Sequence, residues 1–93
     1  MSTAYKFNEP ISKDTFLEVL KEINVTETIT EDTKPSQFCI TDGKDYMWCY
    51  PTEVGIMEFC RYGSNYNAQD FLQYVADKLC LRLSSEQNDE YWN

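Results

Sequence analysis

The sequence predicts an α+β fold: a two-layer sandwich in which an N-terminal and a C-terminal helix cover one face of a three- to four-stranded antiparallel sheet. Three short apolar segments separated by turn residues lie between residues 37 and 62, and segments with helical periodicity flank them. Connections this short join neighbouring strands antiparallel, so the centre of the chain is expected to be a β-meander. The 93 residues are expected to form one domain over residues 1–83, followed by an acidic, mobile tail over residues 84–93.

The first helix is predicted to begin after Ser12. A serine side chain can accept a hydrogen bond from the first helical turn, and Ile11 and Phe16 occupy the two positions of a hydrophobic staple. Apolar residues then recur at helical spacing as far as Ile23. In the following segment, residues 25–30 are rich in β-branched side chains and favour a short edge strand, and Pro35 ends any strand there.

Three strands are predicted next, over residues 37–41, 46–50 and 56–62. Residues 42–45 form a hairpin turn between the first two, because Gly43 can supply the positive φ that such turns need. If Gly43 and Lys44 are the central turn residues, Phe38 lies opposite Cys49. Residues 51–55 form the second turn.

The second helix is predicted to be capped by Asn67. Its apolar stripe consists of Phe71, Leu72, Val75 and Leu79. Residues 79–83 alternate between apolar and polar, so this segment is either a last strand or an apolar continuation of the helix.

The alternation of side chains along the strands gives the strongest functional signal. Tyr46, Trp48 and Tyr50 project from one face of the middle strand, and Met47 and Cys49 from the other. Glu58 should avoid the core, so its face is expected to be exposed and to carry Tyr46, Trp48, Tyr50, Ile56 and Tyr62. The core face is then expected to carry Phe38, Ile40, Met47, Cys49, Met57 and Phe59. The alternative register places the three aromatic residues of the middle strand in the core instead.

Composition argues against several functions. Sixteen acidic residues outnumber eight scattered basic ones, which disfavours direct binding to nucleic acid or to anionic membranes. No apolar run approaches the roughly 18 residues of a membrane span, and the first residues lack the apolar region of a signal peptide, so we expect a cytoplasmic protein. Without histidine or a glycine-rich phosphate loop, neither an enzyme nor a bound cofactor is expected. The four cysteines lack the spacing of metal ligands, which predicts reduced core thiols rather than a disulfide or a metal site.

These observations predict a small acidic protein-interaction module, such as an adaptor, an inhibitor or an immunity-type protein. Its partner-binding residues would be Tyr46, Trp48, Tyr50, Tyr62 and Glu58, and acidic rims would steer a basic protein partner. The alternative is a small-ligand-binding domain with an apolar pocket between sheet and helices. A homodimer through the aromatic face is compatible with both. A continuous acidic field would favour the inhibitor version, and its candidate members are Glu18, Glu22, Glu27, Glu31 and Asp32.

Overall fold

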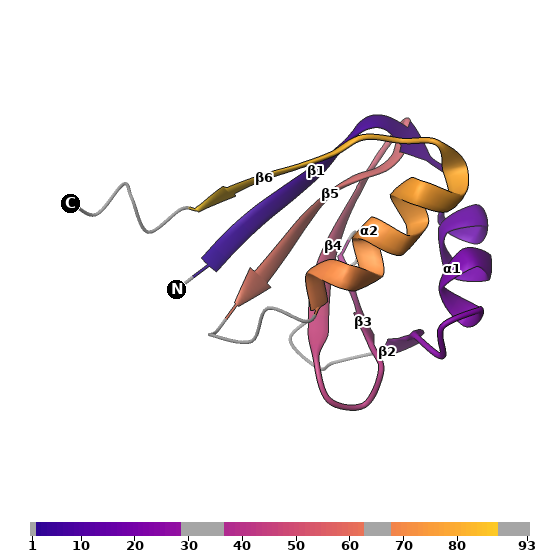
Figure 1. Ribbon diagram of the computed structural model, residues 1–93. Coiled ribbons are helices and arrows are strands. Elements are labelled where there is room, and N and C mark those ends of the chain that lie inside the picture. Colours follow the sequence, from indigo (N-terminus) through magenta and orange to yellow (C-terminus); the bar gives the residue numbers. More distant parts are fainter. Residues whose placement is uncertain (1, 29–36, 63–67, 88–93) are drawn as a thin grey trace.

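The computed structural model describes residues 2–28, 37–62 and 68–87, which form a six-stranded antiparallel open sheet and two helices (Figure 1). Along the chain the elements are β1 (Ser2–Ile11), α1 (Lys13–Lys21), β2 (Thr26–Thr28), β3 (Phe38–Thr41), β4 (Tyr46–Thr52), β5 (Gly55–Tyr62), α2 (Ala68–Leu79) and β6 (Leu83–Gln87). The sheet order is β2-β3-β4-β5-β1-β6. The predicted α+β class is confirmed, but the sheet is larger than the predicted three or four strands. Neither described helix has the length and apolar character needed to cross a membrane.

The predicted meander is formed by β3, β4 and β5. Strands β3 and β4 pair in the predicted register, with Phe38 opposite Cys49. In the hairpin turn the Asp42 carboxylate accepts hydrogen bonds from the N–H groups of Lys44 and Asp45, both at 2.9 Å, and Gly43 has a φ of 96°. The β-branched segment after α1 supplies the edge strand β2, which pairs with β3.

The strand that the sequence analysis did not predict is β1. It pairs antiparallel with β5 on one side and with β6 on the other. Tyr5 and Phe7 point into the core and are 3% and 0% exposed, whereas Lys6 between them is exposed. Pro10 lies in an irregular stretch between the paired residues Lys6 and Ile11, where its missing N–H costs no regular ladder bond.

The end of α2 differs from both predicted alternatives. The helix stops at Leu79, Cys80 takes a φ of 56°, and the N–H of Leu81 donates to the carbonyl of Ala76 at 2.8 Å, which is a Schellman ending. Segment 79–83 is therefore neither one strand nor a continued helix. Strand β6 includes residues 84–87, the first part of the predicted tail. Residues 88–93 and the predicted cap Asn67 lie outside the described residues.

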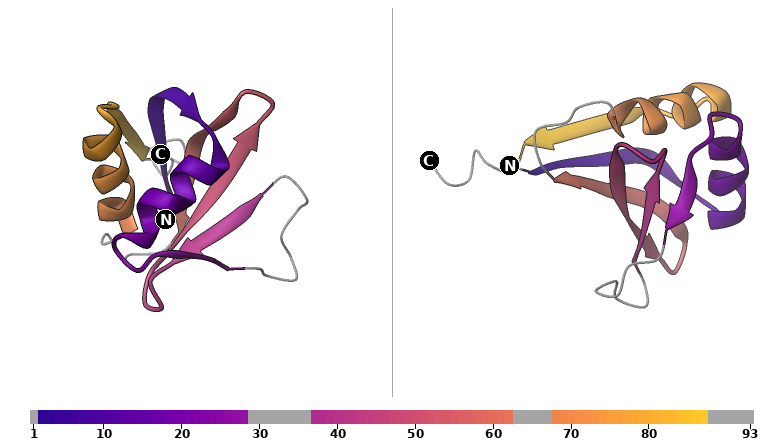
Figure 2. Two further views of the ribbon diagram at one scale, coloured as in Figure 1. Left: turned by 90° about the vertical axis from the view of Figure 1, so that its right-hand side faces the viewer. Right: turned by 90° about the horizontal axis from the view of Figure 1, so that it is seen from below.

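The core lies between the helices and one face of the sheet, and Figure 2 shows both helices on one side of the strands. Three phenylalanines form its centre. The Phe7 ring of β1 lies 4.9 Å from that of Phe59 in β5, and the Phe16 ring of α1 lies 5.4 Å from Phe59. The predicted cap Ser12 holds the start of α1 by accepting a hydrogen bond from the N–H of Thr15 at 3.2 Å.

One buried cation links β1, β5 and α2. Arg61 is 3% exposed, and its guanidinium donates to Thr3 Oγ1 at 2.8 Å and to the Tyr5 hydroxyl at 3.4 Å. The Tyr5 hydroxyl in turn donates to Gln69 Oε1 in α2 at 3.2 Å. Buried polar groups of this kind need such partners, so this network belongs to the core.

A bulge in β5 changes the faces of two residues. Tyr50 pairs with Glu58 but Pro51 pairs with Ile56, so Met57 is an extra residue. Ile56 is 1% exposed and belongs to the core, which corrects its predicted place on the aromatic face. Met57, predicted for the core, is half-buried at its edge.

Candidate functional site

The candidate site is the open face, the side of the sheet that points away from the core. Side chains on this face alternate with the buried ones, and the core residues of both helices pack on the opposite side. The described side chains of the open face include Thr26, Thr28, Cys39, Thr41, Tyr46, Trp48, Tyr50, Glu58, Cys60, Ala4, Lys6 and Ser84.

The three aromatic residues predicted for binding do lie together on this face. Tyr46 is 47% exposed, and Trp48 and Tyr50 are half-buried. Met47 and Cys49, which alternate with them, are fully buried, so the register with the aromatic residues outside the core is confirmed. Of the other two predicted residues, Glu58 is exposed on the same face. Tyr62 ends β5 opposite Ser2, and its side chain lies outside the description.

Two rows of side chains cross the open face. In the first row Cys39, Trp48, Cys60 and Ala4 lie opposite one another on β3, β4, β5 and β1. In the second row Tyr50, Glu58, Lys6 and Ser84 follow on β4, β5, β1 and β6. Cross-strand neighbours of this kind are close enough to interact, so each row acts as one band of neighbouring side chains.

The first row is apolar around Trp48. Its two cross-strand neighbours, Cys39 and Cys60, are only 2% and 8% exposed although neither helix covers this face. Burial raises the pKa of the Cys39 thiol, so this group stays protonated at neutral pH and is a poor nucleophile. The predicted burial of the cysteines holds for Cys39, Cys49 and Cys60, whereas Cys80 is exposed at the end of α2.

The second row borders a hollow of about 530 Å³. Tyr50, Glu58 and Lys6 supply its large side chains, while Ala4 and Ser84 leave room because they are small. The hollow therefore lies on the open face and not between the sheet and the helices, where the alternative prediction placed a pocket. Sequence reasoning missed Lys6, Ala4 and Ser84 because it did not predict β1 or the extent of β6.

Lys6 and Glu58 are the only charged side chains that the structure describes on the open face. They are directly opposite each other on neighbouring strands, and both are exposed. Neither forms an ion pair with the other or with any other residue in the described part of the chain. Both line the hollow, so their charges are available to a molecule bound there.

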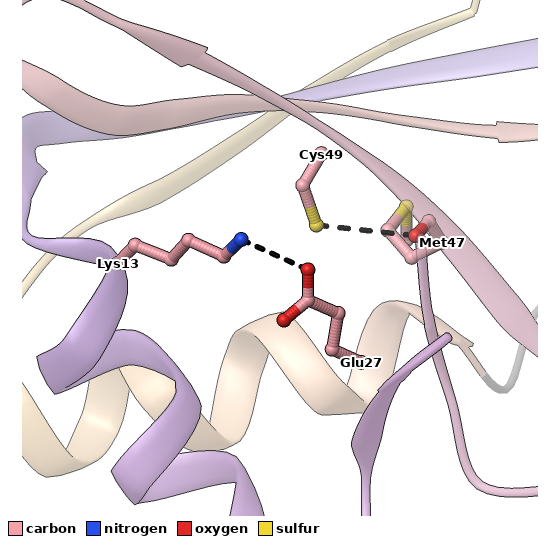
Figure 3. A network of polar contacts seen from close by, with 4 residues as sticks. All are labelled: Lys13, Glu27, Met47 and Cys49. Carbon is pink, nitrogen blue, oxygen red and sulfur yellow. Dashed lines mark hydrogen bonds and ion pairs between the residues drawn. The ribbon is translucent and has the colours of Figure 1, made fainter. Parts of the chain in front are cut away.

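Two of the five carboxylates proposed for an acidic field are engaged on the helix side. Figure 3 shows Lys13 of α1 reaching Glu27 of β2, with a distance of 2.8 Å between Nζ and Oε1. The Lys13 ammonium also lies 4.3 Å from the centre of the Phe38 ring, which fixes the edge of the sheet to the helix. Nearby in Figure 3, the buried Cys49 thiol donates to the Met47 carbonyl at 3.9 Å, and burial holds its pKa well above the usual range.

The second engaged carboxylate joins the two helices. Glu22 accepts a hydrogen bond from the Tyr74 hydroxyl at 2.8 Å and lies 3.2 Å from Lys78 Nζ. The Tyr74 hydrogen bond, followed by that of Lys78, lowers the pKa of Glu22. Glu18 is exposed, and Glu31 and Asp32 lie outside the described residues. The described carboxylates thus give no support to a continuous acidic field.

Comparison with known proteins adds no assignment. No family model, curated protein or solved structure matches this chain. Within the described residues, no group of three or more histidine, cysteine, aspartate or glutamate side chains is placed to hold a metal ion. The chemistry of the open face is therefore the basis for a functional proposal.

Proposed function

We propose that this chain is a small protein-interaction module that binds a protein partner through the open face. The observation that carries the proposal is the line of Tyr46, Trp48 and Tyr50 along β4, on the side that neither helix covers. Tyrosine and tryptophan are enriched among the residues that contribute most to protein–protein binding, because they bury a large area and keep a polar group for a hydrogen bond. No catalytic role is proposed for these residues.

The chemistry of the open face favours a partner surface that is apolar and close to neutral. The chain has a formal net charge of −8, but on the open face Lys6 and Glu58 lie opposite each other and carry opposite charges. A strongly basic partner, as the composition suggested, would be attracted to other parts of the molecule more than to this face.

We also propose a cytoplasmic location, which is supported by three buried cysteines without a disulfide.

The proposal can be tested by site-specific photo-cross-linking in the cells that produce the protein. A photoreactive amino acid replaces Tyr46 on the open face or, as the matched control, Glu18 on the exposed surface of α1. We expect a discrete protein adduct from position 46, its loss when Trp48→Ala is added, and none from position 18. Equal adducts from both positions, or adducts only from position 18, would show that the open face is not the interaction surface.

A second candidate function, binding of a small ligand, is favoured by the hollow. Its volume of about 530 Å³ lies in the range of ligand pockets, roughly 300–1,000 Å³, and it combines Tyr50 with two opposite charges. Replacing the exposed Ser84 with phenylalanine should fill the hollow. Under this alternative, NMR shifts caused by a library of small polar aromatic compounds would disappear in Ser84→Phe. Shifts that persist in this variant would contradict binding in the hollow.

A further inference from the structure

We infer that the partner of the open face is a second copy of the same chain, so that the protein forms a twofold-symmetric dimer with open face against open face. This inference rests on the proposed interaction role of that face and names its partner. The observation that leads to it is the juxtaposition of Lys6 and Glu58, two opposite charges side by side in one row that make no ion pair within the described chain.

Under twofold symmetry, this pair of opposite charges on one protomer is complementary to the same pair on the other protomer. If the axis lies in the interface, parallel to β1 and β5 and midway between them, Lys6 of one protomer faces Glu58 of its partner, and the reverse contact forms at the same time. The two charge pairs then lie antiparallel, which is the favourable arrangement of two dipoles side by side. Such an isologous interface requires a self-complementary patch, and the neighbouring positions of Lys6 and Glu58 provide one.

The rest of the face suits the same partner. Tyr50 stands next to Glu58 in the same row, and Trp48 stands in the adjacent row between the buried Cys39 and Cys60. Homodimer interfaces are more apolar than ordinary protein surface, and these aromatic and buried side chains beside the charge pair fit that composition. Because Lys6 and Glu58 carry opposite charges, two copies can approach at this pair of residues with less repulsion than at a purely acidic surface of a chain of net charge −8.

Charge reversal gives a sharp test by sedimentation equilibrium. Lys6→Glu places carboxylates at both positions, so four negative charges would meet at the axis of a dimer, and Glu58→Lys places four positive charges there. We expect the wild type to dimerise and each single variant to dimerise at least about tenfold more weakly, a loss of the size found for close charge pairs in interfaces. The double variant with the two charges exchanged should recover dimerisation. An equimolar mixture of the two single variants should form a heterodimer.

Control variants separate the interface from the overall charge. Glu58→Lys and Glu18→Lys each make the net charge two units less negative, but Glu18 lies on α1, away from the open face. If general repulsion between acidic chains governs association, both variants dimerise more tightly. We expect only Glu18→Lys to keep or tighten the dimer. Lys6 and Glu58 are exposed, so circular dichroism should show the wild-type fold in every variant.

Other outcomes overturn the inference and are distinguishable from failure of the proposed function. A wild type that stays monomeric at about 100 μM, where a dimer with a micromolar Kd would be populated, contradicts the dimer. If position 46 then still cross-links to a protein of a different mass, the open face binds a different partner and the proposed function stands. A dimer that tolerates both single charge reversals uses another surface, which also overturns the inference.

Discussion

Replacing Gly55 with alanine should destabilise the protein strongly, because this glycine lies where two strands approach each other. Gly55 begins β5 with a φ of 130°, a conformation that residues with a side chain rarely adopt. A Cβ atom there would lie 2.6 Å from the carbonyl oxygen of Ile11 and 3.1 Å from its carbonyl carbon. These are backbone atoms of β1, which cannot rotate away. Backbone strain of roughly 1–3 kcal/mol and overpacking of roughly 1–3 kcal/mol together give an expected loss of about 2–6 kcal/mol.

Urea unfolding of a matched pair of variants measures this effect. Gly43 has a φ of 96°, but a Cβ atom there has no neighbour within 4 Å. Gly43→Ala should therefore lose only the strain contribution, about 1–3 kcal/mol. Equal losses in the two variants would refute the reasoning, because they would show that the end of β1 does not lie against the β4–β5 turn.

Three further predictions concern other parts of the fold. Cys80→Gly should stabilise the protein by about 0.5–1 kcal/mol in urea unfolding, because Cys80 holds a positive φ of 56° at the end of α2, where glycine is favoured; a loss of stability would show that its side chain packs. Of the four cysteines, Cys80 should react first with a thiol reagent under native conditions, since it is exposed and the other three are buried. Glu22→Gln should lower stability at neutral pH. Hydrogen bonds from Tyr74 and Lys78 hold the pKa of Glu22 below its ordinary 4.5. The difference in stability between wild type and variant should therefore shrink as the pH falls through that lowered pKa. A difference in thermal unfolding that stays constant from neutral pH down to about pH 3 would contradict this.

The parts of the fold that the sequence predicted well are those fixed by neighbouring residues. The turn at Gly43 sets the register of β3 and β4, and the alternation along β4 then assigns Tyr46 and Trp48 to the open face. Strand β1 depends on distant residues, because Ala4 pairs with Cys60. A period-two signal does exist in Tyr5, Lys6 and Phe7, but three residues before a proline do not by themselves specify a central strand.

The change of face at Ile56 has a similar cause. The prediction assumed regular alternation through β5, which places Ile56 on the same side as Glu58. Pro51 has no N–H to donate to the ladder, and the pairing of β4 with β5 is irregular at this residue. The one-residue bulge moves Ile56 into the core and leaves Glu58 on the open face. The exposure of Glu58 therefore predicted the face of the aromatic residues of β4 correctly, but not the face of Ile56.

The charge of the open face depends on topology more than on composition. A net charge of −8 suggested acidic rims and a basic partner. In the fold, Glu22 and Glu27 are engaged by lysines on the helix side, and β1 places Lys6 directly beside Glu58. Without β1 next to β5, Glu58 would be the only charged side chain described on the open face, and two such faces would repel each other. The pairing of β1 with β5 places Lys6 opposite Glu58, and this juxtaposition is the basis on which we propose a second copy of the chain as the partner.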